Sequence, residues 1–256
     1  MNARDFIALY TLSRREVMRF IRIWTQTLLP SPISILLYFV IFGSLIGSRI
    51  GMLEGHRYVD YIAPGLIMMA IINNSYANVV ASSYVAKFQR SIEEMFVSPM
   101  PPLIILLGFL IGGIARGLLV ALIVTGVALW FTDLMVYNWF VTLTVGILTS
   151  VLFSLAGLIN GIFANSFDDI NIVPTFILTP LTYLGGVFYS IHILPPFWQK
   201  VSYFNPIFYM VNTFRYGMLG ISDINVTLSL CFLIIFIIGL WGWAWWLLSR
   251  GIGVRS

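Results

Sequence analysis

Long apolar runs without charged residues constrain this chain more than any other feature. The run from about Trp24 to Ile46 contains no Asp, Glu, Lys or Arg, and several later runs are comparable. At about 1.5 Å of rise per residue, a helix of this length crosses the roughly 30 Å hydrocarbon layer of a bilayer. Hydrophobic residues make up 59% of the chain and charged residues 9%, which is too little polar surface for a soluble globule. The sequence therefore predicts an integral membrane protein.

The pattern of these runs predicts an all-α polytopic membrane protein with six transmembrane helices. Alternating segments of about ten residues, which barrel strands would require, are absent. We place the spans at about 24–46, 61–85, 103–131, 139–163, 172–188 and 227–248, within one membrane domain covering residues 1–256. No secretory signal peptide is expected, because several charged residues precede the first long apolar run. The lone Cys231 excludes an internal disulfide.

Residues 3–23 have the periodicity of an amphipathic helix. One side gathers the arginines, and the other gathers Phe6, Leu9, Tyr10, Val17, Phe20, Ile21 and Trp24. Such a helix would lie along the lipid headgroups, with its arginines near anionic lipid. The alternative is a basic leader that only satisfies the topology rule. We favour the interfacial helix.

The distribution of basic residues predicts the orientation. One side of the membrane would carry Arg4, Arg14, Arg15, Arg19, Arg22, Lys87, Arg90, Arg250 and Arg255. The other side would carry Arg49, Arg57, Lys200 and Arg215. Because cytoplasmic loops carry the excess of Lys and Arg, both termini are expected in the cytoplasm.

The segment 87–99, KFQRSIEEMFVSP, is the most charged short window after the N-terminal helix. Its apolar residues recur at helical spacing, Arg90 can pair with Glu94, and Pro99 ends the helix. An apolar stripe exposed to water would need a protein partner, whereas a second helix on the membrane surface is the alternative. The residues proposed for contact with the partner are Lys87, Phe88, Arg90, Ile92, Glu93, Glu94, Met95 and Phe96.

A few polar and small residues interrupt the spans. Asn74 and Asn78 lie four apart, where bonding between helices is favoured over substrate contact. Arg116 is expected to reach the interface or to pair inside the bundle. The pairs Gly108 with Gly112, Gly113 with Gly117 and Gly157 with Gly161 allow close helix approach. Asp168 and Asp169 most simply cap the following helix, with partner contact as the alternative.

The stretch from Pro174 to Gly220 is too apolar for a surface loop and too rich in proline for one regular span. Backbone groups freed by proline must be buried in protein or line a wet cavity. This stretch is therefore the predicted translocation region. Its marked residues are Gly185, Gly186, Pro195, Pro206, Tyr209 and Arg215.

The chain lacks recognisable catalytic, metal-binding and nucleotide-binding motifs. It contains no G-x-S-x-G, H-E-x-x-H or Walker A sequence, and His56 and His192 lie in predicted loops. No nucleic-acid partner is expected, because the main basic cluster precedes a membrane span. All acidic residues, Glu16 included, fall in predicted loops or at span ends, which argues against ion coupling. Energy for transport is therefore expected from another polypeptide, and the chain is expected to be neither an enzyme nor a holder of a cofactor or metal.

The run Leu178, Leu181, Leu184-Gly185-x-Val187, Leu194-Pro195, Pro206-Ile207-x-Tyr209 and Arg215 resembles the pattern of ABC-2 type transporter permeases. The resemblance implies that residues 87–99 form a cytosolic coupling helix docked on an ATPase subunit. It also implies short re-entrant helices on the outer side within residues 189–220. Two ABC-type ATPase subunits, which bind ATP and Mg, would join a permease homodimer formed through the first and fifth spans. The implied location is the bacterial inner membrane.

Export is the transport direction that the resemblance implies, and family substrates include lipid-linked glycans, lipids and amphipathic small molecules. The sequence does not select among them. An ATP-independent channel or secondary carrier is the alternative function, and a membrane scaffold is a third.

Overall fold

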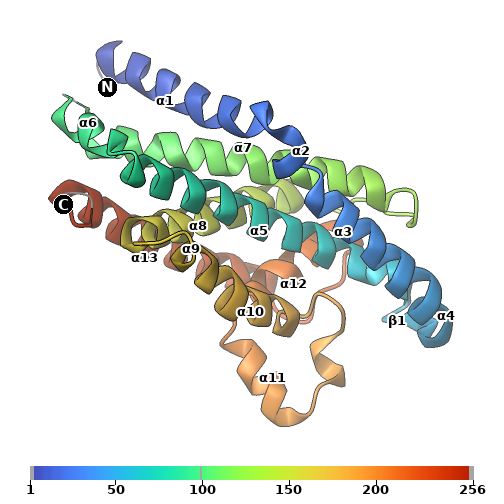
Figure 1. Cartoon of the computed structure of the whole chain (residues 1–256). Helices are drawn as coiled ribbons and strands as arrows, with labels where there is room; N and C mark the ends of the chain where they lie inside the picture. Colours follow the sequence, from blue (N-terminus) through green and yellow to red (C-terminus); the bar gives the residue numbers. More distant parts are fainter. Residues whose placement is uncertain (1–2, 99, 254–256) are drawn as a thin grey trace.

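The computed structural model describes residues 3–98 and 100–253, and nearly all of this part is helical (Figure 1). Its elements in chain order are α1 (Ala3–Arg22), α2 (Trp24–Thr27), α3 (Pro30–Tyr38), η1 (Phe39–Ile46), α4 (Gly47–Ile50), β1 (Met52–Leu53), β2 (His56–Arg57), α5 (Tyr58–Phe88), α6 (Ser91–Val97), α7 (Pro102–Ala128), α8 (Trp139–Phe163), α9 (Asp169–Val173), η2 (Pro174–Leu178), α10 (Thr179–Leu184), η3 (Ile191–Ile193), α11 (Pro196–Tyr203), α12 (Pro206–Leu219) and α13 (Val226–Arg250). Pro99 and Arg255, which entered the predictions above, lie outside the described residues.

Within this part, four helical segments are long and apolar enough to cross a membrane. They are Trp24–Gly43, Pro102–Ala128, Trp139–Phe163 and Val226–Arg250, which match the predicted first, third, fourth and sixth spans. Helix α5 has 31 residues, but its asparagines and serines make it more polar than these four. The predicted fifth span is divided among α9, η2 and α10. The chain is an all-α polytopic membrane protein.

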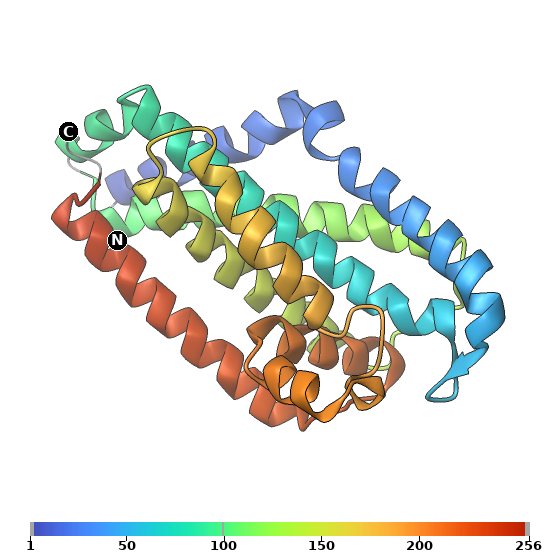
Figure 2. The same ribbon diagram turned by 60° about the horizontal axis from the view of Figure 1, so that its bottom comes forward.

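The centre of the bundle consists of α5, α7 and α8, which pack side by side through small residues (Figures 1 and 2). A Cβ atom built on Gly117 would lie 1.9 Å from Ser75 Oγ, and one on Gly157 would lie 2.6 Å from the Tyr76 carbonyl oxygen. Similarly, a Cβ on Gly161 would lie 2.0 Å from Ser83 Oγ. An added Cβ would meet backbone at Gly157 and would require a serine side chain to move at Gly117 and Gly161, so the predicted close approach at the glycine pairs is confirmed.

Helix α1 forms as predicted, and the side that meets the bundle overlaps the predicted apolar side only at Phe20 and the half-buried Val17. Its buried residues are Leu12, Glu16 and Phe20, which follow one another at intervals of four. Much of the predicted apolar side remains exposed, namely Phe6, Tyr10, Ile21 and Trp24. Helix α7 receives α1 at two glycines: a Cβ on Gly108 would lie 2.3 Å from Leu12 Cδ2, and one on Gly112 would lie 2.6 Å from Glu16 Cβ.

Prolines divide the first and fifth predicted spans. Helix α3 begins at Pro30, where the missing amide proton costs nothing, and continues into the wide-turn segment η1. Pro174 begins the second wide-turn segment, η2, between α9 and α10. Such π-type turns are rare and accommodate local disturbance of the helical hydrogen-bond ladder.

The two ends of the bundle are distinct (Figures 1 and 2). Both described chain ends and α6 lie at one end, whereas the β1–β2 hairpin lies at the other. At the hairpin end, Arg57 bonds to Asp60 at 2.8 Å and to Asp133 at 2.6 Å, which joins the start of α5 to the loop before α8. Hydrogen bonding to Asp60 raises the pKa of Arg57. The start of α1, the helix α6 and the end of α13 therefore lie at the same end of the molecule.

Candidate functional site

The predicted coupling segment is two helices joined by a sharp turn. Lys87 and Phe88 are the last residues of α5, and α6 covers Ser91–Val97. Between them, Arg90 has a left-handed backbone with φ of 59°, which is uncommon for a residue other than glycine. Arg90 therefore precedes α6, and the helical spacing on which the predicted pair with Glu94 depended does not form.

The apolar stripe predicted for this segment consists of Phe88, Ile92, Met95 and Phe96. The last three pack inward, so the expectation that they face water is wrong, whereas Phe88 remains exposed. Ile92 is 1% exposed and Met95 7% exposed, and both belong to a core cluster with Leu106, Leu158 and Ile162. Phe96 is partly buried against the same cluster. These side chains hold α6 on the bundle and leave its opposite face for contacts with other molecules.

Lys87 also contacts its own chain. Its Nζ donates hydrogen bonds to the carbonyl oxygens of Ile162 at 2.8 Å and Ala164 at 2.9 Å, at the C-terminus of α8. A cation at this position satisfies carbonyl groups that the helix leaves without partners. Lys87 therefore stabilises the junction of α5 and α8.

The outward face at this end combines apolar and charged side chains, and we call it the α6 surface. It consists of Phe88, Arg90, Glu94, Val97 and Phe167, which are all exposed. The side chains of Phe88 and Val97 are 66% and 88% exposed, respectively. Phe167 comes from the loop between α8 and α9, and its ring centroid lies 5.7 Å from that of Phe88. Of the predicted contact residues, Phe88, Arg90 and Glu94 are on this surface, and Glu93 is half-buried.

Asp169 fixes the loop that carries Phe167. Its carboxylate accepts hydrogen bonds from the backbone N–H groups of Asn165 at 2.8 Å and Ser166 at 3.1 Å, while Ser166 Oγ accepts from the Asp169 N–H at 3.2 Å. This reciprocal pair is a helix-capping arrangement, which confirms the predicted capping role for Asp169. Asp168, at the N-cap of α9, makes no side-chain cap hydrogen bond, so the same prediction is wrong for Asp168. The backbone hydrogen bond from Asn165 contributes most to lowering the pKa of Asp169, because it stabilises the carboxylate.

In the predicted translocation region, the structure brings Gly185, Gly186 and Arg215 together. Gly186 has a positive φ of 73°, and its carbonyl oxygen accepts a hydrogen bond from Nη2 of Arg215. Arg215 is only 2% exposed, and its guanidinium carbon lies 4.0 Å from the centre of the Tyr61 ring. A guanidinium stacked on an aromatic ring is stabilised by the ring quadrupole. Arg215 thus joins α12 to α5 and to the turn after α10.

The turn after α10 also contacts α5 through its backbone. A Cβ on Gly65 would lie 2.7 Å from the carbonyl oxygen of Val187, and Tyr58 Oη donates to the carbonyl oxygen of Phe188 at 3.0 Å. Within Pro174–Gly220, the turn at residues 185–188 is therefore packed against α5, whereas Pro180, Pro195 and Pro196 are exposed. The predicted burial of this stretch in protein thus holds for the turn and not for every proline. Nearby, burial raises the pKa of Asp223, whereas Arg215 opposes this shift.

The remaining marked residues organise the short helices α11 and α12. Pro195 precedes α11, and Pro206 is the first residue of α12, whose start is capped by Asn205 Oδ1. Tyr209 Oη donates to the Tyr203 carbonyl oxygen at 2.8 Å. Figure 2 shows α11 and α12 beside the start of α13, away from α6. Pro195 precedes α11 and Arg215 is in α12; among the six predicted residues, Arg215 contacts Gly186 directly through its hydrogen bond.

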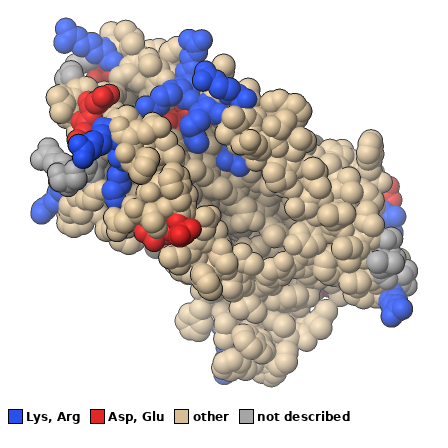
Figure 3. Space-filling view, in the orientation of Figure 1, with Lys and Arg blue, Asp and Glu red and all other residues tan. Residues whose placement is uncertain are grey.

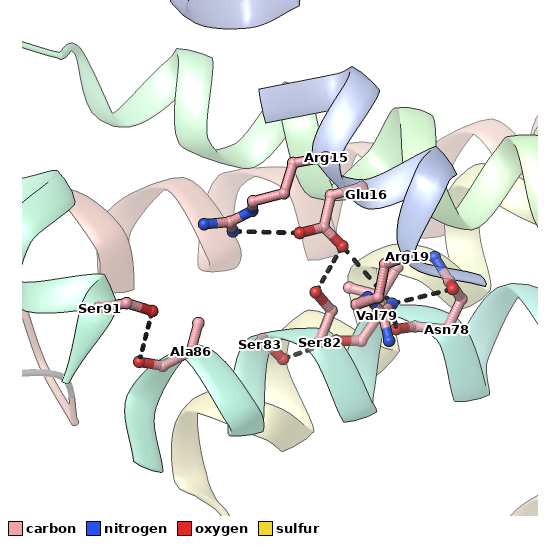
Figure 4. Close-up of polar contacts among 9 residues, drawn as sticks. All are labelled: Arg15, Glu16, Arg19, Asn78, Val79, Ser82, Ser83, Ala86 and Ser91. Atoms are coloured by element: carbon pink, nitrogen blue, oxygen red, sulfur yellow. Dashed lines mark hydrogen bonds and ion pairs between the residues drawn. The ribbon is translucent and has the colours of Figure 1, made fainter. Parts of the chain in front are cut away.

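A buried polar network, which sequence analysis missed, lies between α1 and α5 (Figure 4). Glu16 is 1% exposed and accepts hydrogen bonds from Ser82 Oγ and from Nη2 of Arg15, the latter at 3.1 Å. Arg19 lies 3.5 Å from Glu16 and donates to Asn78 Oδ1 at 3.0 Å. Glu16 is therefore not at a solvated span end, contrary to the expectation. Its position four residues from Leu12 and Phe20 was the available signal.

The other polar residues of the spans bond to neighbouring helices. Asn74 Nδ2 donates to Ser31 Oγ at 2.8 Å, which confirms bonding between helices. Arg116 Nη2 donates to the carbonyl oxygen of Thr27 at 2.9 Å, so it bonds inside the bundle to a backbone group.

Comparisons with known proteins agree with this architecture. The family described as ABC-2 type transporter matches residues 7–219. The chain is 54% identical over 252 residues to the inner membrane transport permease YadH of Escherichia coli strain K12, covering 98% of each chain. It is also 24% identical over 206 residues to nodulation protein J of Rhizobium leguminosarum bv. viciae, covering 79% of this chain and 78% of that protein.

This similarity extends over nearly the whole chain and includes α1, α6 and the proline-rich region. Family membership implies a transport subunit that works with an ABC ATPase. Together with the apolar helices, the relationship supports a multi-pass protein of the inner membrane. The chain belongs to the ABC-2 type transporter family.

Proposed function

We propose that the chain is the permease subunit of an ABC exporter and that a separate subunit hydrolyses ATP. The α6 surface is the observation that carries this proposal. It presents exposed aromatic and charged groups on a helix whose inner face is anchored in the core. A movement imposed on α6 would therefore be transmitted to α5 and α7. The coupling helix proposed for residues 87–99 thus acts through Phe88, Arg90, Glu94 and Val97.

The proposed topology has six spans and cytoplasmic termini. At about 1.5 Å per residue, the 31 residues of α5 are long enough to cross the bilayer in spite of their polar side chains, which face protein. The fifth span consists of α9, η2 and α10 and ends at the proline-rich turn. The location of both described chain ends beside α6 supports one cytoplasmic side (Figure 1). Helices α11 and α12 are the proposed outer re-entrant elements.

Two permease chains and two ATPase subunits form the proposed transporter. The first and fifth spans contact each other within one chain, where the hydroxyl oxygens of Tyr38 and Tyr183 are 3.2 Å apart. Both spans expose apolar side chains, among them Ile33 at 55% and Phe176 at 73% exposure, which supports this pairing. A homodimer formed through these two spans would enclose a passage between the chains.

Within the passage, we propose that Gly185, Gly186, Pro195, Pro206, Tyr209 and Arg215 belong to the outer closure. ATP and Mg are bound by the partner, and the permease itself holds no cofactor. The proposed cargo is a lipid-linked glycan, a lipid or an amphipathic small molecule. Export requires that the cargo bind the inward-open and outward-open states of the passage with different affinity. ATP binding by the partner shifts the equilibrium between these two states.

Co-purification with an ABC ATPase from the same genome tests the α6 surface. Glu94→Lys combined with Val97→Asp should abolish the complex and permease-dependent ATP hydrolysis, because both side chains are exposed. Glu54→Lys is the matched control, since Glu54 is an exposed acid on the hairpin at the other end of the bundle. Unchanged binding by the α6 variant would contradict the coupling assignment. ATP-independent uphill transport by the permease alone would contradict the proposed function.

A further inference from the structure

A cleft separates α1 from the α6 end of α5. Its volume is about 420 Å³, and its walls include Arg15, Arg19 and Arg22 from α1. Figure 3 shows basic side chains gathered over α1 on this face of the molecule. In Figure 4, the guanidinium of Arg15 points away from Arg19 and toward Ala86 and Ser91, which also line the cleft.

The charge in this cleft is not balanced by acidic groups. Glu16 is the one acidic residue in its lining and contacts both Arg15 and Arg19. Among the described residues, Arg22 has no ion-pair partner, and Nε of Arg19 is buried without an acceptor. Guanidinium donors therefore exceed the available acceptors. An anion would satisfy these donors and offset the excess positive charge.

The remaining walls of the cleft are largely apolar. Met18, Ile23, Val85 and Ala86 line it beside the arginines. Next to the cleft, Ile21 near the end of α1 and Trp24 at the start of α2 are 42% and 53% exposed, which suits an acyl boundary. An occupant with an anionic head and apolar chains would match both kinds of wall, whereas a small inorganic ion would match the arginines alone.

We propose that this cleft binds the phosphate group of an anionic lipid headgroup, with Arg15 and Arg22 as its direct donors and Arg19 as the residue that orders them. The lipid chains would run along the exposed side of α1. Lipid binding at this cleft would not depend on nucleotide or on the ATPase. It can therefore be tested independently of the proposed function.

Lipid binding to the purified full chain in a neutral detergent tests the proposal. Phosphatidylglycerol should raise the unfolding temperature in a saturable manner, because a ligand that binds only the folded state stabilises it. Diacylglycerol has the same tails without phosphate and should have no such effect. The double variant Arg15→Gln with Arg22→Gln should weaken the apparent phosphatidylglycerol affinity at least tenfold.

Arg14→Gln is the matched control, because Arg14 is an exposed arginine of α1 outside the cleft lining. The apparent phosphatidylglycerol affinity of this variant should stay within twofold of that of the parent chain. If Arg14→Gln weakens binding as much as Arg22→Gln alone, the effect is general charge attraction and the site is wrong. Equal stabilisation by diacylglycerol would also overturn the proposal. Saturable binding of inorganic phosphate at the same affinity would overturn the assignment to a lipid.

Discussion

Glu16 is a buried carboxylate, and its ion pairs with Arg15 and Arg19 should stabilise the folded chain. Its replacement by Gln should lower the free energy of unfolding by about 2 kcal/mol, because Arg19 would lose its charged acceptor in a largely buried position. Thermal unfolding in detergent measures this effect. Arg15→Gln should cost less, since the Arg15 side chain is 45% exposed and its interaction is screened by water. Equal stability of Glu16→Gln and the parent chain would contradict the structural role.

Arg215 should not be replaceable by lysine. Lysine keeps the positive charge but loses the planar group that both stacks on Tyr61 and reaches the Gly186 carbonyl oxygen. Arg215→Lys should lower the unfolding temperature by several degrees and make the turn at residues 185–188 more accessible to proteolysis. Tyr61→Phe retains the ring and is the control, which should change little. A variant with lysine that is as stable and as resistant as the parent would show that the geometry is unimportant.

At this scale, some roles could be predicted from sequence and others could not. The capping role of Asp169 followed from its place before an apolar run. By contrast, burial of Glu16 depends on which side of α1 meets Gly108 and Gly112 of α7, a contact between distant segments. Periodicity placed the arginines on one side but could not determine which side the bundle would cover.

Replacing a glycine by alanine in the central helices should change the stability in opposite directions, depending on whether the added Cβ meets another helix. Gly157→Ala should destabilise the chain, because its Cβ would meet a backbone carbonyl at 2.6 Å, which cannot move as a side-chain end can. Gly126→Ala, also in a helix, has nothing within 4 Å of the added Cβ. It should stabilise by up to about 1 kcal/mol through helix propensity. Unfolding temperatures of both variants in one detergent provide the measurement. The same sign for both would contradict the packing account.

At the scale of elements, the apolar pattern predicted where the helices lie but not whether their apolar sides face water, lipid or the protein core. The spacing of Ile92 and Met95 predicted the short helix α6, but spacing cannot show whether an apolar stripe faces water or its own core. The wide turns η1 and η2 were not foreseen: Pro174 marks the start of η2, but η1 contains no proline. Helix α5 was recognised as a span from length in spite of polar residues, whose partners lie on other helices.

For the whole molecule, the proposed homodimer predicts where two chains approach. Because Cys231 is the only cysteine, a Cys231→Ser chain provides a clean background for single cysteines. Phe176→Cys on the fifth span should form a disulfide-linked dimer in membranes treated with oxidant. Ile235→Cys on α13 is the control: its side chain is 66% exposed in the monomer, similar to the 73% of Phe176, but it should face lipid. Crosslinking at position 235 and none at 176 would place the interface on α13.

In the proposed transporter, this chain forms the passage, and the ATPase partner drives its conformational change by moving α6. The most direct measurement is the distance between spin labels on Val97→Cys in a Cys231→Ser homodimer within lipid nanodiscs. With the ATPase subunits bound, ATP and vanadate should shift this distance distribution, and without them ATP should leave it unchanged. A nucleotide-dependent shift in the permease alone, or no shift in a complex that hydrolyses ATP, would contradict the account.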